Sequence, residues 1–141
     1  HQMKESPPWP MRLVIALLEE TIAKNPVDKN RLYVTGLSMG GYATWDLLQR
    51  FPKKFAAAMP ICGGGDLNHA GDLVDIPLWV FHGDADEIVP VSRSRDMVQA
   101  IKKAGGNPTY TEYSQVMHDS WTRTYSNPQV WEWVFAQKKA R

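Results

Sequence analysis

One serine in the sequence stands in a setting that could make it a nucleophile. Residues 36–40 read Gly-Leu-Ser-Met-Gly, so Ser38 has a glycine two positions away on either side. Residues 31–35 predict a strand and residues 42–50 predict a helix. A sharp strand-to-helix turn strains the serine backbone and leaves no space for side chains at the two glycine positions. The serine oxygen would stand at a helix N-terminus, which favours developing negative charge. The alternative is an ordinary structural turn.

A serine hydroxyl needs a base, and the chain offers four histidines. His118 follows the last predicted strand and is the natural base. His1 begins the chain, and His69 lies in a polar loop where we expect it to be solvated. His82 precedes a glycine at a strand end, where we expect packing or a hydrogen bond to the loop.

The base in turn needs an orienting carboxylate. Asp84, Asp86 and Glu87 all follow the predicted strand at residues 77–81. The carboxyl ends of parallel strands gather at one edge of a sheet, so these acids, Ser38 and His118 should meet there. The chain order serine, acid, histidine is the one typical of this arrangement. Spacing alone does not choose among the three acids.

The elements that must position these residues alternate along the chain. Apolar patterning predicts helices at residues 11–24, 42–50, 92–104 and 128–138, and strands at residues 31–35, 55–59, 77–81 and 109–113, with loops at 62–71 and 115–127. The side chains expected to face inward from three of the helices are Met11, Val14, Ile15, Leu18, Ile22, Met97, Val98, Ile101, Val130, Trp131, Val134 and Phe135. Such alternation predicts an α/β fold with a mostly parallel sheet of about four strands and flanking helices.

Composition excludes several other classes of protein. The 141 residues fit one domain, with 43% hydrophobic and 22% charged residues and a net charge of +1, so nothing favours a nucleic-acid partner. No apolar run is long enough to span a membrane. Cys62 is the single cysteine and is expected to be a small buried apolar residue. The histidine and cysteine spacings predict no metal site, residues 84–87 lack the spacing of a calcium loop, and no cofactor is expected.

Four segments together resemble a known family. Residues 36–47, 60–66, 81–90 and 118–121 are similar, in sequence and order, to α/β-hydrolase esterases described as predicted peptidases or as phospholipase/carboxylesterase-like, relatives of feruloyl and polyhydroxyalkanoate-type esterases. The resemblance runs from about residue 9 to residue 137. It implies that Ser38, Asp86 and His118 form the catalytic triad. It also implies that the backbone N–H of Met39 is one donor of the oxyanion hole.

The sequence departs from the family before the nucleophile. The family has about four strands there, one followed by a loop that supplies the second oxyanion donor. Here only one predicted helix precedes Arg31. We therefore expect residues 1–141 to be a single truncated domain, the C-terminal half of an α/β-hydrolase fold. The chain begins at His1 without an initiator methionine or signal peptide, which suggests an excised piece and leaves its compartment unknown. The strand before Ser38 would become a sheet edge, which predicts self-association.

The resemblance predicts a serine esterase acting on a small-molecule ester with a short acyl or aryl group. Trp121 either borders the substrate pocket beside His118 or packs the loop. Two alternatives stay open: a peptidase or amidase that uses the same triad, and a non-catalytic fragment that serves in binding or assembly.

Overall fold

The fold is built around a four-stranded parallel sheet. The structure, a computed structural model, describes residues 2–140. The strands β1 (Tyr33–Leu37), β2 (Ala57–Ile61), β3 (Trp79–Gly83) and β4 (Thr109–Tyr113) lie side by side in chain order. Every neighbouring pair is parallel. This confirms the predicted fold class. β4 has the predicted bounds, and the other three strands begin two residues later than expected.

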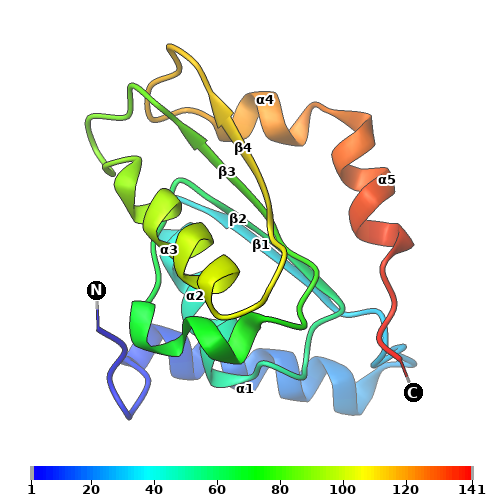
Figure 1. The fold of residues 1–141 in the computed structure, drawn as a ribbon. Helices are drawn as coiled ribbons and strands as arrows, with labels where there is room; N and C mark the ends of the chain where they lie inside the picture. Colours follow the sequence, from blue (N-terminus) through cyan, green and yellow to red (C-terminus); the bar gives the residue numbers. More distant parts are fainter. Residues whose placement is uncertain (1, 141) are drawn as a thin grey trace.

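Helices cover both faces of the sheet (Figure 1). The first face carries α1 (Trp9–Lys24), α2 (Met39–Arg50), α3 (Ser92–Lys103) and the 3-10 helix η1 (Leu67–Leu73), and the second carries α4 (Trp121–Tyr125) and α5 (Pro128–Ala136). The predictions of plain loops at 62–71 and 115–127 were wrong, because these segments contain η1 and α4. Helices of five to seven residues are too short to display a hydrophobic period.

Each strand divides its side chains between two hydrophobic clusters. In β3, Val80 packs on the side of α1, α2 and α3, while Phe81 packs on the side of α5. This is the alternation expected of a strand that is covered on both faces. Most of the predicted inward side chains are buried or half-buried.

Two predicted inward side chains are exposed, and both predictions were wrong. Val14 is 45% exposed because the sheet face buries only a narrow stripe of α1, in which Met11 alone is fully covered. Phe135 is 52% exposed because α5 reaches the edge of the sheet, where the Phe135 ring packs against Tyr33 of β1. No strand of residues 2–140 lies beyond β1 to cover either helix further.

The strand that leads to Ser38 is therefore an edge strand, as predicted. Its partner β2 has every side chain buried, and β1 has none that is fully buried. Within residues 2–140 no helix combines the length and apolar character that crossing a bilayer requires.

Candidate active site

The turn that carries Ser38 is strained, as the sequence predicted. Ser38 has φ 54° and ψ −116°, a conformation that side chains rarely adopt and that costs about 1–3 kcal/mol. A side chain on Gly36 would place its Cβ 2.3 Å from the carbonyl oxygen of Gly40, so only glycine fits at position 36. The Ser38 amide donates to the carbonyl of Ile61 at 3.0 Å, which ties the turn to the end of β2.

The second glycine of the pattern acts differently from the prediction. A Cβ on Gly40 meets nothing within 4 Å outside its own helix, so no neighbouring segment excludes a side chain there. The close approach falls one residue later. A Cβ on Gly41 would lie 2.3 Å from the oxygen of Ile61, and one on Gly63 would lie 2.5 Å from the carbonyl carbon of Gly41. These two glycines let the first turn of α2 rest directly on the end of β2.

His118 reaches Ser38 because its loop crosses the end of β3. A Cβ on Gly83 would lie 2.2 Å from the carbonyl oxygen of Val116, so glycine at position 83 permits the crossing. The amide of Ala85 donates to the same carbonyl at 3.0 Å. His118 Nε2 then lies 2.9 Å from Ser38 Oγ. The structure thus brings the predicted nucleophile and the predicted base into hydrogen-bond contact.

Of the three candidate acids, only Asp86 is buried and reaches His118. Its Oδ2 lies 2.8 Å from His118 Nδ1, and its Oδ1 accepts hydrogen bonds from the amides of Ile88 and Val89 at 2.9 Å each. Asp84 and Glu87 are exposed, and Asp84 accepts from the amide of Gln115 at 2.6 Å as a loop cap. Asp86, the acid that the family resemblance implies, is therefore the one of the three that contacts His118.

The hydrogen bonds define the proton positions. Burial opposes ionisation of Asp86, but the hydrogen bonds from His118 and from the two amides outweigh it and lower the pKa of this carboxyl. An ionised carboxylate only accepts, so His118 Nδ1 carries a hydrogen and donates it. His118 Nε2 is then an acceptor for the Ser38 hydroxyl. This is the tautomer in which His118 can take the serine proton.

The other two predicted site residues, Met39 and Trp121, lie next to Ser38 and His118. Met39 is the first residue of α2, and the leading amides of a helix have no acceptor within the helix. Trp121 is half-buried and meets the ring of His118 edge to face, with centroids 5.3 Å apart. His69 pairs with Asp72 at the surface, away from the site. His1 lies outside the described residues.

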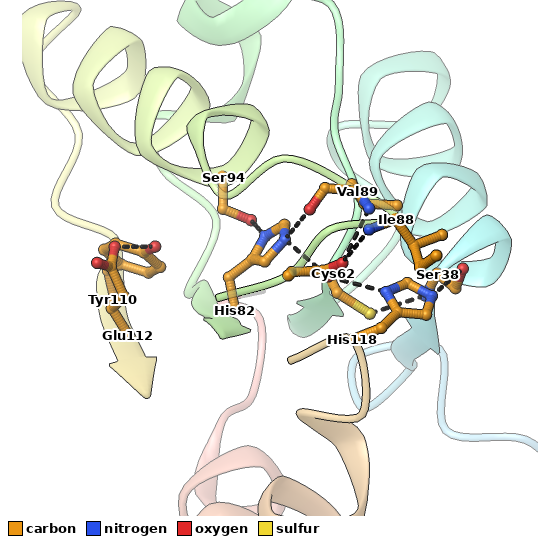
Figure 2. Close-up of polar contacts among 10 residues, drawn as sticks. Ser38, Cys62, His82, Ile88, Val89, Ser94, Tyr110, Glu112 and His118 are labelled. Carbon is orange, nitrogen blue, oxygen red and sulfur yellow. Dashed lines mark hydrogen bonds and ion pairs between the residues drawn. The ribbon is translucent and has the colours of Figure 1, made fainter. Parts of the chain in front are cut away.

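Two contacts of the site were not foreseen in the sequence. Cys62 is fully buried as expected, but its Sγ also accepts from the Ser38 amide at 3.2 Å, and burial raises the pKa of its thiol. His82 bonds the loop as predicted, through the carbonyl of Val89 at 2.9 Å, but its ring also meets Asp86 and Ser94 (Figure 2). The His-Gly pair at the end of a buried strand was the available signal for His82. Nothing in the sequence pointed to Ser94.

Among the described residues, one group has donors close enough to share a metal ion. The ligand atoms of Cys62, Asp86 and His118 all lie within 4.8 Å of one another. A metal held there would need the same Asp86 and His118 atoms that hydrogen-bond to each other. Binding of a metal there would therefore break the hydrogen bond between His118 and Asp86.

Known proteins agree with this fold. The chain is an α/β-hydrolase. It belongs to the phospholipase/carboxylesterase family, whose sequence model matches residues 8–128. Among solved structures, a thermostable esterase superposes over 94% of this chain and 38% of its own, with a TM-score of 0.91 and 43% identity. An acylaminoacyl peptidase of Pyrococcus horikoshii superposes over 99% of this chain and 30% of its own with a TM-score of 0.82, but at 18% identity it supports the fold alone.

Two curated proteins match shorter segments. Acyl-protein thioesterase 1 homolog 2 of Dictyostelium discoideum is 34% identical over 84 residues, which cover 56% of this chain and 37% of that protein. Poly(3-hydroxyalkanoate) depolymerase C of Paucimonas lemoignei is 40% identical over 48 residues, which cover 34% of this chain and 12% of that protein. The chain thus aligns with well under half the length of each relative.

Proposed function

We propose that this chain carries the nucleophile, base and acid of a serine esterase that hydrolyses short-chain acyl or aryl esters. The observation that carries the proposal is the series of two hydrogen bonds that joins Ser38 to His118 at 2.9 Å and His118 to Asp86 at 2.8 Å. A serine with a base in contact and a carboxylate behind the base is the arrangement that activates a hydroxyl for attack on a carbonyl.

In the proposed acylation step, Ser38 Oγ bonds to the ester carbonyl carbon while its proton passes to His118 Nε2. The carbonyl oxygen becomes an oxyanion, which the Met39 N–H stabilises at the N-terminus of α2. When the intermediate collapses, the bond to the leaving alkoxide breaks, and His118 returns the proton to that oxygen. Asp86 stabilises the imidazolium that exists between these two transfers.

Deacylation repeats the same transfers with water. His118 takes a proton from a water molecule whose oxygen attacks the acyl carbon, and then returns the proton to Ser38 Oγ as the acid leaves. The proposed site has one assigned oxyanion donor. A single donor of this kind contributes about 10²–10³ in turnover.

Trp121 is proposed to border the acyl group. Its ring packs against the ring of His118 and stays half-buried, so part of its apolar surface faces the space beside the base. The thioesterase and depolymerase names of the relatives place ester and thioester bonds ahead of amides as substrates to test.

The test is hydrolysis of a p-nitrophenyl acyl ester by this chain and by its Ser38→Ala variant. Loss of the nucleophile should lower kcat by at least about 10³-fold. Ser114→Ala, which alters an exposed serine next to β4, is the matched control and should keep the wild-type rate. Equal rates in wild type and Ser38→Ala would refute the assignment. A matched oxygen ester, thioester and amide then rank the three bond types.

A further inference from the structure

A second histidine, His82, lies close to the same carboxylate oxygen of Asp86 that His118 contacts. His82 lies in β3, and its side chain is fully buried, as is that of Asp86. His82 Nε2 is 2.9 Å from the carbonyl oxygen of Val89 and 3.3 Å from Asp86 Oδ2, and His82 Nδ1 is 2.7 Å from Ser94 Oγ. Figure 2 shows the ring of His82 between Ser94 and Val89. The proposed reaction assigns this ring no task.

The partners of His82 define its tautomer. The carbonyl of Val89 can only accept, so Nε2 must carry the hydrogen. Nδ1 of the neutral ring then presents a lone pair, and the Ser94 hydroxyl donates to it. Burial lowers the pKa of His82, in keeping with a neutral ring. Nε2 also lies 3.3 Å from Asp86 Oδ2, so the N–H that bonds the Val89 oxygen stands next to that carboxylate oxygen.

Three N–H groups bond the carboxylate, and His82 contacts it. The amides of Ile88 and Val89 donate to Oδ1, His118 donates to Oδ2, and His82 Nε2 lies 3.3 Å from Oδ2. The two amides hold one oxygen from the loop that follows β3. His82 meets the other oxygen from a buried strand, and α3 supplies the Ser94 hydroxyl that orients His82. The carboxylate thus contacts β3 directly, and through His82 it is linked to α3.

We propose that His82, oriented by Ser94, is a positioning residue that holds Asp86 Oδ2 in line with His118 Nδ1. The inference rests on the proposed function for its effect on turnover, since Asp86 acts there only through His118. Its geometric content, a His118–Asp86 hydrogen bond that depends on His82, is measurable without any reaction.

The direct test observes the His118 Nδ1 proton by NMR in the Ser38→Ala background, where no hydrolysis is needed. A hydrogen held between imidazole and a buried carboxylate gives a far-downfield signal, assigned by its loss in His118→Asn. We expect the signal to broaden into exchange or vanish in His82→Leu. It should persist in His82→Gln, because the glutamine amide can supply a donor near the position of Nε2. An unchanged signal in His82→Leu, or no signal in the parent, overturns the proposal.

The kinetic test uses the same substitutions with Ser38 intact. His82→Leu should lower kcat by about 10- to 100-fold with KM within about twofold, because misplacement of a catalytic group affects the transition state and not substrate binding. His82→Gln should recover most of that loss. A fall in kcat that His82→Gln shares equally, with the NMR signal intact, would show a structural role and overturn the proposal.

Ser94→Ala covers the case in which His82→Leu does not fold. It keeps the imidazole and removes only the hydroxyl donor, so the His118 Nδ1 proton should exchange with water measurably faster. An unaltered exchange rate overturns the proposal. If wild-type hydrolysis proves independent of Ser38, the proposed function fails, while the NMR result still decides the role of His82.

Discussion

Replacing Asp86 by asparagine should stop hydrolysis by reversing one hydrogen bond. Asparagine keeps the shape of the side chain but has one oxygen and one NH₂ group. The oxygen must stay at the Oδ1 position, because the amides of Ile88 and Val89 both donate there at 2.9 Å. The NH₂ group then occupies the Oδ2 position, 2.8 Å from His118 Nδ1.

Two donors cannot share that contact, so His118 must move its hydrogen from Nδ1 to Nε2. In that tautomer Nε2 faces Ser38 Oγ with a hydrogen, across the 2.9 Å contact through which it should accept a proton. A triad with the wrong tautomer loses about 10⁴ in kcat, which corresponds to about 5 kcal/mol of transition-state stabilisation. We expect a loss of that size with a little-changed KM.

The assay compares initial rates on a p-nitrophenyl ester for wild type, Asp86→Asn and Ser38→Ala, with Ser38→Ala defining the background. Asp84→Asn is the matched control, since Asp84 accepts a loop amide outside the series and asparagine keeps that acceptor. Thermal unfolding checks that both asparagine variants are folded. An Asp86→Asn rate within about tenfold of wild type would refute the tautomer reasoning.

Three further predictions concern a close backbone contact, an ion pair and the edge strand of the sheet. Gly41→Ala should lower the free energy of unfolding by about 1–3 kcal/mol, because its Cβ meets the main-chain oxygen of Ile61 at 2.3 Å. Urea unfolding should show no such loss for Gly71→Ala, whose Cβ points into open space. Equal urea midpoints for the two variants would contradict the close packing at Gly41. The hydrogen bond from Arg95 lowers the pKa of Glu112 from its usual 4.5 to about 2, so its contribution to stability is present above about pH 4.5 and is lost as the pH falls toward 2. Arg95→Leu should reduce this acid-dependent loss in urea midpoints measured at about pH 7 and about pH 3, and an identical pH dependence in both proteins would argue against the pair. The edge strand β1 should promote self-association, so sedimentation velocity should show a coefficient that rises with protein concentration, and a monomer at all concentrations would exclude it.

The meeting of Ser38, the acidic loop and His118 could be predicted because a parallel sheet gathers its strand ends. Ser38, the acidic loop and His118 each follow a strand that the sequence indicated, and strand direction alone brings them to one edge. The choice of Asp86 over its neighbours could not be made from spacing. It depends on which carboxylate the turn after β3 directs inward, and that is decided by the hydrogen bonds of its backbone.

Contacts that depend on how individual side chains pack between elements were beyond prediction. Ser94 meets His82 from a helix 12 residues further on, and a buried serine in a helix carries no signal of its own. The exposure of Val14 and Phe135 depends on how much sheet lies beneath α1 and α5, which a helical period does not record. The short η1 and α4 depend on local hydrogen bonds rather than on pattern: Asp66 accepts from the Asn68 amide, and Asp119 accepts from the Thr122 amide.

The proposed nucleophile and its proposed base follow the two outer strands of the sheet. Ser38 follows β1, His118 follows β4, and 80 residues separate them in the chain. Every strand pair in between is parallel and joins distant segments, a topology of high contact order that folds slowly. During refolding, the Ser38–His118 bond can form only after both outer strands have docked. Recovery of hydrolysis should therefore trail the return of helical circular dichroism and mark the last step of assembly.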